Sequence, residues 1–213
     1  MAQLAIWMLI AFGVFTFGVR VVIQLRRTGS TGLIGLRRDA GVADWLSGIL
    51  FVGGMAIGVA TPILVLQDHL DPIDALDVDV LHVIGIALAA SGGVAVFAAQ
   101  LGMGESWRIG VSDEERTELI TSGWFSVVRN PIYTAMIVGW TGLALIVPAW
   151  LAFAAVVTIA LGLELQVRFV EEPYLIRAHG SEYRAYASRV GRFLPGLGRT
   201  QHTGSARGSA ARR

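Results

Sequence analysis

The chain of 213 residues contains no cysteine and no lysine, and only 15% of its residues are charged. The absence of cysteine excludes disulfides, thiolate metal sites, cysteine nucleophiles and lipidation at a C-terminal cysteine. A soluble protein has about 25% charged residues, whereas 54% of this chain is hydrophobic. The four histidines are scattered, and no two have the spacing that places ligands on one helix face, so no metal site is expected. The composition therefore predicts a membrane protein.

The apolar residues lie in long blocks separated by short polar segments. A helix needs about 20 residues to cross a hydrocarbon core of about 30 Å. Three blocks meet this length, the fourth is near the lower limit, and Pro148 makes a tight turn between the fourth and the fifth. The prediction is an all-α, polytopic membrane helix bundle of about five transmembrane helices with a cytoplasmic C-terminal helix. The five blocks are Leu4–Leu25, Val42–Leu66, Val80–Leu101, Pro131–Val147 and Ala149–Val167.

The distribution of arginine predicts the orientation, because cytoplasmic loops are enriched in basic residues. The loop at Arg26–Gly41 carries four arginines, whereas the loop at Gln67–Asp79 carries none and has five aspartates. The stretch from Arg168 onward is again rich in arginine. We therefore expect the N-terminus outside and the C-terminus in the cytoplasm, and the inner membrane as the location if the source is bacterial. The first block lacks a basic start and a small-residue cleavage site, so it is not expected to be a secretory signal.

Three segments are expected along the chain. Residues 1–101 are predicted to form three N-terminal transmembrane helices, and residues 102–198 a cytoplasmic loop, a helical hairpin and a C-terminal helix. The tail at 199–213 is predicted to be disordered, with arginines that contact anionic lipid. Small residues at helical spacing predict close helix packing, namely Gly54 with Gly58 and Gly85 with Ala89. Arg20 and Gln24 are expected to snorkel or to make polar contacts within the bundle.

Polar residues stand at the start of the fourth block. The sequence Arg129-Asn130-Pro131 places a cation, an amide and a helix-starting proline at one membrane boundary, and Tyr133 lies in the same turn. The free N–H groups of a first helical turn and the positive end of the helix dipole can receive a carboxylate. The alternative is a capped helix with an interfacial tyrosine anchor.

A second polar group ends the fifth block. Spacings of three and four place Glu164, Arg168 and one of Glu171 and Glu172 along one helical face. Neighbouring residues of a helix point about 100° apart, so the two adjacent glutamates cannot face one partner in the same way. One could pair with arginine while the other binds a ligand. The alternative is an ion-paired ladder where the helix leaves the membrane.

The segment at 102–130 is too polar to span and rich in aromatic residues. Trp107 and Arg108 are its leading pair, because tryptophan favours the membrane interface and Arg108 could anchor an anionic headgroup. Ser112 with Glu115 fits a helix cap followed by a capping-box acid. The alternative is an interfacial helix that only joins two spans.

Four motifs occur in a specific order between about Gln100 and Pro195: LGMGESWRIGV, ELITSGWFSVVRNPIYTAM, EEPYLI and HGSEYRAYASRVGRFLP. In this order they resemble the isoprenylcysteine carboxyl methyltransferase and phospholipid methyltransferase family. The family pattern is RHPxYxG, a hydrophobic stretch and then a glutamate pair. This chain has Asn130 at the histidine position and Ala135 at the glycine position.

The resemblance implies an S-adenosylmethionine pocket among cytoplasmic helix ends, in an integral membrane methyltransferase. Arg129 and Glu172 are the catalytic residues expected from it, and Trp107 with Arg108 the residues expected at the substrate. The expected cofactor-binding residues are Asn130, Pro131, Tyr133, Glu171, Glu172, Tyr183 and Tyr186. A glycine-rich dinucleotide signature is missing from the sequence.

The acceptor is expected to be a lipophilic small molecule or a lipid-modified group that enters from the bilayer. Methylation of a carboxylate oxygen is favoured, because a carboxylate is ionised at neutral pH and Asn130 cannot act as a titrating base. Methylation of a lipid amine stays open. Two other classes also fit, namely a sterol-reductase-like enzyme whose arginines bind NADPH and a non-enzymatic membrane scaffold or transporter. Membrane lipids are expected partners, nucleic acid is not, and no oligomeric state is predicted.

Overall fold

The computed structural model describes residues 1–31, 41–104 and 118–200. These residues form helices and turns, with one isolated bridge between Val128 and Gly191, so the predicted all-α class is confirmed. Segments η1 and η4 are π-helical and η3 is a 3₁₀ turn. In chain order the elements are α1 (Ala2–Gly13), η1 (Val14–Val19), α2 (Arg20–Thr28), α3 (Val42–Leu66), α4 (Asp79–Gly102), η3 (Gly123–Ser126), α5 (Pro131–Ile146), α6 (Trp150–Leu165), η4 (Gln166–Glu171) and α7 (Glu172–Arg189).

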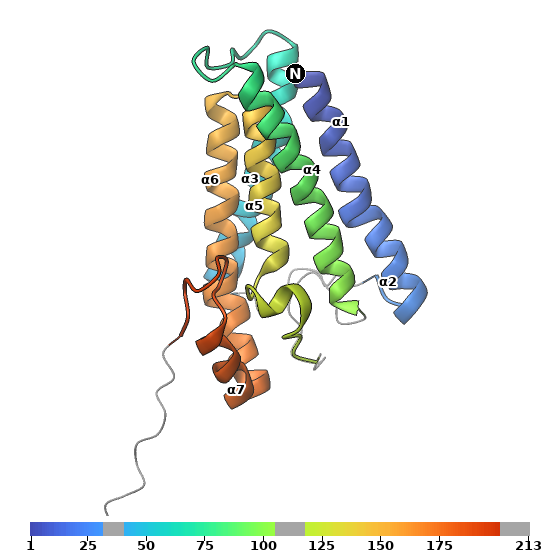
Figure 1. The fold of residues 1–213 in the computed structure, drawn as a ribbon, viewed down its shortest axis with the longest axis vertical. Helices are drawn as coiled ribbons and strands as arrows, with labels where there is room; N and C mark the ends of the chain where they lie inside the picture. Colours follow the sequence, from blue (N-terminus) through green and yellow to red (C-terminus); the bar gives the residue numbers. More distant parts are fainter. Residues whose placement is uncertain (32–40, 105–117, 201–213) are drawn as a thin grey trace, which may run out of the picture.

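Each of the five predicted apolar blocks forms a helix in the bundle. Four described helices are long and apolar enough to cross a membrane: Ala2–Thr28, Val42–Leu66, Asp79–Gly102 and Trp150–Arg189. The shorter α5 has 16 residues, which corresponds to a length of about 24 Å. The predicted C-terminal helix is present as α7, but it continues from α6 through η4 without a break in the helical run (Figure 1).

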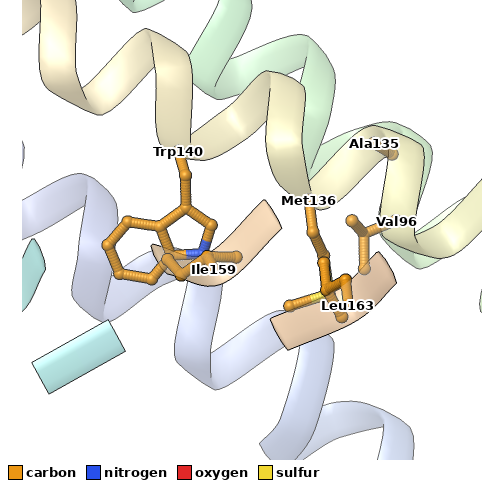
Figure 2. Close-up of a cluster of buried hydrophobic side chains, with 6 residues drawn as sticks. All are labelled: Val96, Ala135, Met136, Trp140, Ile159 and Leu163. Carbon is orange, nitrogen blue, oxygen red and sulfur yellow. The ribbon is translucent and has the colours of Figure 1, made fainter. Parts of the chain in front are cut away.

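Two helix pairs make the most extensive contacts of the bundle, α4 with α5 and α3 with α6. A cluster of buried side chains joins these pairs, and Figure 2 shows Trp140 and Met136 of α5 beside Ile159 and Leu163 of α6. Many large apolar side chains on the helices are exposed instead, among them Trp7, Ile49, Val83, Val94 and Leu161. Apolar residues on both the inner and outer faces are what a membrane bundle requires, because lipid replaces water around it.

Glycines allow these helices to approach one another closely, as the small-residue spacing predicts. A Cβ atom at Gly85 of α4 would lie 2.7 Å from the carbonyl oxygen of Gly142 in α5. A Cβ atom at Gly54 of α3 would lie 2.9 Å from the backbone nitrogen of Ile159 in α6. Small residues at such contacts are typical of membrane helix packing, where van der Waals contact replaces the hydrophobic effect.

Arg20 lies inside the bundle and does not snorkel. Its side chain is among the most deeply buried of the described residues, with a residue exposure of 1%, and Nη2 donates to the carbonyl oxygen of Gly104 at 2.7 Å. Gln24, one turn later, is buried as well. Of the two alternatives predicted for these residues, polar contact within the bundle is therefore confirmed for Arg20.

Candidate functional site

The two polar groups predicted from the sequence meet at one end of the bundle. Because α5 and α6 are antiparallel, the start of α5 and the end of α6 lie at the same end (Figure 1). The chain then folds back after α7 as a return segment, residues Val190–Thr200. The backbone nitrogens of Arg129 and Asn130 donate to the carbonyl oxygens of Gly191 and Arg192 at 2.8 and 3.1 Å. These bonds hold the return segment against the residues that precede α5.

Arg129 connects the start of α5 to α7 and to the return segment. Its Nη2 donates to Oε1 of Glu172 at 2.7 Å and to the carbonyl oxygen of Gly198 at 2.9 Å. Its Nη1 donates to the carbonyl oxygens of Ala187 and Val190 at 2.8 and 3.2 Å, at the end of α7. The residue is only 5% exposed. The Arg129 guanidinium thus satisfies the last carbonyls of a helix and the buried Glu172 carboxylate at the same time.

Glu172 has a second arginine partner that the sequence analysis did not single out. Arg192 donates from Nε to Oε1 of Glu172 at 2.8 Å and from Nη2 to Oε2 at 2.9 Å. Its Nη1 reaches Oε1 of Glu164 at 3.0 Å. The hydrogen bonds to Glu172 raise the pKa of Arg192 above its usual value, so this side chain stays charged. We call the four side chains the charge ladder: Glu164, Arg192, Glu172 and Arg129.

Glu171 belongs to a different network. Its Oε1 accepts a hydrogen bond from the Tyr133 hydroxyl at 2.5 Å, and the Gln166 side chain also bonds to the Glu171 carboxylate. Oε1 of Gln166 accepts in turn from the hydroxyl of Ser47, on α3, at 2.7 Å. The prediction that the adjacent glutamates face different partners is confirmed, and Glu172 is the one that pairs with arginine.

The π-helical turn η4 changes the directions in which the side chains of both networks point. Residues five apart lie about 140° from each other in an α-helix, whereas the i to i+5 bonds of a π turn bring them near one face. Gln166 and Glu171 are five apart, at the two ends of η4, and their side chains interact. The extra residue in this turn also lets Glu164 and Glu172, eight apart, share Arg192. Of the predicted face of Glu164, Arg168 and one later glutamate, Arg168 lies 3.8 Å from Glu164 at the i to i+4 spacing, whereas Glu172 is connected to Glu164 through Arg192.

The remaining predicted residues occupy the same end of the bundle. Pro131 begins α5 as predicted, and Nδ2 of Asn130 donates to the carbonyl oxygen of Arg192 at 3.1 Å. The Tyr186 hydroxyl donates to the carbonyl oxygen of Phe125 at 2.6 Å, and its ring makes an edge contact with the buried Tyr183 ring at a centroid distance of 6.1 Å. Tyr186 therefore links α7 to η3, the turn that precedes α5, and Tyr183 packs against Tyr186.

Some predicted residues lie outside the described part of the chain, and Arg168 lies at the edge of the site. Trp107, Arg108 and the pair Ser112 and Glu115 lie outside the described residues, as does most of the tail, 201–213. The Arg168 side chain is 58% exposed, with its Nη1 3.8 Å from Oε1 of Glu164. Within the described ranges no group of three or more histidine, aspartate or glutamate side chains is arranged to hold a metal ion.

The site therefore contains two kinds of carboxylate at one helix boundary. Glu172 lies between two guanidinium groups, so its charge is balanced within the protein. Glu171 bonds to Tyr133 and Gln166, and no ion pair is found for it among the described residues. A carboxylate held by neutral groups can attract a cationic ligand or accept from its hydroxyl and amine groups.

Comparison with known proteins gives a family match for the segment that contains this site. Residues 80–182 match the family model described as phospholipid methyltransferase. The matched segment runs from α4 into α7 and contains Arg129, Tyr133, Glu171 and Glu172. The match covers just under half of the chain, and it confirms for this segment the resemblance to the isoprenylcysteine carboxyl and phospholipid methyltransferase group seen in the sequence. The chain is accordingly a multi-pass membrane protein.

One curated relative is the nickel-cobalt-cadmium resistance protein NccN of Alcaligenes xylosoxydans xylosoxydans. It is 31% identical to this chain over 87 residues. The alignment covers 41% of this chain and 40% of NccN, so the chain matches less than half the length of that relative.

Proposed function

We propose that this protein is an S-adenosylmethionine-dependent membrane methyltransferase that acts on a lipophilic acceptor, with methylation of a carboxylate oxygen favoured. The observation that carries the proposal is the placement of Glu171. Its carboxylate is held by Tyr133 and Gln166 beside the charge ladder, at one end of a membrane bundle and within the family segment.

The residues at this end fit the polar groups of S-adenosylmethionine. When bound, the cofactor supplies a methyl group on a cationic sulfonium. Glu171 would accept from its amine or a ribose hydroxyl, and the first turn of α5 offers backbone N–H groups to its carboxylate. Tyr183 and Tyr186 would close the pocket from α7, and Asn130 and Pro131 would form its edge.

Arg129 and Glu172 take a positioning role in this proposal. Each of the two terminal nitrogens of Arg129 already donates to acceptors of the protein, and Glu172 is held by Arg129 and Arg192. Together they fix the start of α5 against α7 and the return segment. Charged side chains whose terminal atoms are paired within the protein can orient a site without contacting the reacting atoms.

The environment favours an acceptor that is already ionised. A carboxylate, with a pKa of about 4, needs no base at neutral pH, and its negative charge cancels the sulfonium charge in the transition state, which a dry site promotes. Asn130 stands where an imidazole base would be expected, and its amide nitrogen donates to the carbonyl oxygen of Arg192. Trp107 and Arg108 are the proposed contacts for the acceptor headgroup. The acceptor would arrive from the bilayer and the cofactor from the cytoplasm.

Methylation of a lipid amine is the second candidate. It is favoured by the description of the matching family as phospholipid methyltransferase. A protonated amine must lose a proton before it attacks, and Glu171 is a carboxylate that can accept one. Both candidates use the same cofactor and the same end of the bundle.

The test is methyl transfer by the detergent-purified protein with methyl-labelled S-adenosylmethionine and a membrane lipid extract. A labelled methyl ester releases volatile methanol in mild base, whereas an N-methyl group does not, so one experiment separates the two acceptors. Base-labile label is the expected result. Consumption of NADPH without methyl transfer would support a reductase. The absence of both activities, together with no cofactor binding in equilibrium dialysis, would support a scaffold and contradict the proposal.

A further inference from the structure

We propose that Ser47 and Gln166 are positioning residues that orient Glu171 across the bundle, so that α3 forms part of the methyl-transfer site. The inference rests on the proposed function and deepens it. The family segment begins at residue 80, so Ser47 lies outside it. No feature of the family motifs points to a serine on the second membrane helix.

The hydrogen bonds form a continuous line from α3 to α5. An amide side chain has one accepting oxygen and one donating nitrogen. In Gln166 the oxygen accepts from the Ser47 hydroxyl at 2.7 Å, which leaves the nitrogen available to the Glu171 carboxylate at the other end of η4. Glu171 then accepts from the Tyr133 hydroxyl. The Ser47 hydroxyl also lies 2.9 Å from the carbonyl oxygen of Asp44, and its shorter contact is the one to Gln166. While Ser47 holds the amide oxygen of Gln166, the amide nitrogen stays available to Glu171.

The backbone packing places Ser47 at this point. A Cβ atom at Gly162, one helical turn before Gln166, would lie 3.0 Å from the carbonyl oxygen of Ser47 and 2.8 Å from the nitrogen of Phe51. The absence of that atom lets α3 and α6 touch. Ser47 is 1% exposed, so water does not compete for its hydroxyl. The π turn then aligns Gln166 with Glu171, as described above.

The hydrogen bonds from Ser47 through Gln166 to Glu171 differ from the charge ladder in their expected effect on fold stability. The ladder joins full charges and the end of α7, and its loss would destabilise the fold. The Ser47–Gln166–Glu171 line contains neutral groups and one carboxylate, and it ends at the carboxylate proposed to meet the cofactor. Its disruption should therefore change ligand binding more than thermal stability.

The variants are Ser47→Ala, Gln166→Leu and the double variant, with Thr158→Ala as the matched control. Thr158 is half-buried on α6, and its hydroxyl donates to the carbonyl oxygen of Ala154 within the same helix at 2.7 Å. The measurements are the S-adenosylmethionine dissociation constant, the melting temperature and the separate KM values for cofactor and acceptor, all on the full chain in detergent. We expect Ser47→Ala to weaken cofactor binding about threefold to tenfold, the effect of one hydrogen bond.

Gln166→Leu should weaken binding at least as much, and the double variant no more than Gln166→Leu alone, because the two residues act through one line. The melting temperature of Ser47→Ala should match that of Thr158→Ala, and the acceptor KM should not change. If Gln166→Leu does not fold, Ser47→Ala alone carries the test.

Parent-like cofactor binding by Ser47→Ala would overturn the inference while the proposed function stands, and so would effects on cofactor binding that add in the double variant. A parent protein that binds no S-adenosylmethionine would overturn both. A weakened dissociation constant with an unchanged melting temperature would support both.

Discussion

At the scale of single residues, two adjacent glutamates bind different kinds of partner. Glu172 receives hydrogen bonds from Arg129 and Arg192, whereas Glu171 receives them from Tyr133 and Gln166. Removing one partner of a buried ion pair costs about 3–5 kcal/mol, because the other charge is left uncompensated. Losing one charge-assisted hydrogen bond to a ligand costs about 1.5–3 kcal/mol of binding free energy. The same substitution at the two positions should therefore have different effects.

We expect Glu172→Gln to lower the melting temperature clearly, with a loss of about 3–5 kcal/mol in unfolding free energy. Glu171→Gln should leave the melting temperature close to that of the parent and weaken S-adenosylmethionine binding about tenfold to a hundredfold. The two measurements are made on detergent-purified protein. If both variants bind the cofactor like the parent, the glutamate pair is purely structural, and the pocket lies elsewhere.

Arg192 provides a second test at this scale, with Arg168 as its natural control. Both arginines approach Glu164, but the Arg168 side chain is 58% exposed and 3.8 Å away, whereas Arg192 also binds Glu172. Exposed ion pairs contribute about 0–1 kcal/mol, so Arg168→Met should leave thermal stability nearly unchanged. Arg192→Met should cost about 3 kcal/mol or more. Equal melting temperatures for the two variants would show that the ladder does not stabilise this end of the bundle.

At the scale of elements, the helices follow from the apolar blocks, whereas their local irregularities do not. Periodicity and length locate each block because burial in lipid forces the backbone to satisfy its own hydrogen bonds. The π turn η4 depends on a balance of backbone bonds that spacing rules do not describe. Pro173 is the one signal in the sequence, since a proline has no N–H to donate and membrane helices accommodate it by local π adjustments. Because α-helical spacing rules do not describe a π turn, the sequence did not predict that Gln166 and Glu171 lie on one face.

A second irregularity lies within α7, where Gly180 has φ 55° and ψ −121° and divides the helix into two parts. No atom lies within 4 Å of a Cβ built there, so a substitution meets backbone strain and not a clash. We expect Gly180→Ala to cost about 1–3 kcal/mol of unfolding free energy. The control is Gly13→Ala, at a helical φ of −60° with equally open space, where alanine should not destabilise. Matching melting temperatures for both variants would contradict the expected strain.

At the scale of the whole molecule, the sequence predicts which end of the bundle carries the site but not how its parts are joined. The antiparallel hairpin follows from two apolar blocks and a proline turn, and it brings the start of α5 next to the end of α6. Ser47 and Gln166 are 119 residues apart, and Arg129 and Gly198 are 69 apart. Such contacts depend on how close the helices approach, which a single sequence does not specify. The polar residues of the motifs therefore define the site only together with the tertiary packing that joins them.

The orientation of the bundle in the membrane remains a prediction. The structure adds which loops lie together at each end. The backbone nitrogen of Ile73 donates to the carbonyl oxygen of Pro148 at 2.7 Å, so the aspartate-rich loop lies beside the turn between α5 and α6. Figure 1 shows this loop and the N-terminus at one end and α7 at the other. The positive-inside rule places the arginine-rich end in the cytoplasm. Asp74 should then be external, and the site cytoplasmic.

Because the chain has no cysteine, single substitutions report this orientation without interference. Asp74→Cys lies in the aspartate-rich loop, and Ser126→Cys lies in η3, an exposed position close to the site. In intact cells a membrane-impermeant maleimide should label the cysteine at position 74, and it should label the one at position 126 only after the membrane is opened. The cysteine-free parent is the control for background labelling. Labelling of position 126 in intact cells, with position 74 protected, would reverse the orientation. The proposed pocket would then face away from the compartment where S-adenosylmethionine is made, and a cytoplasmic source of the cofactor could not reach it.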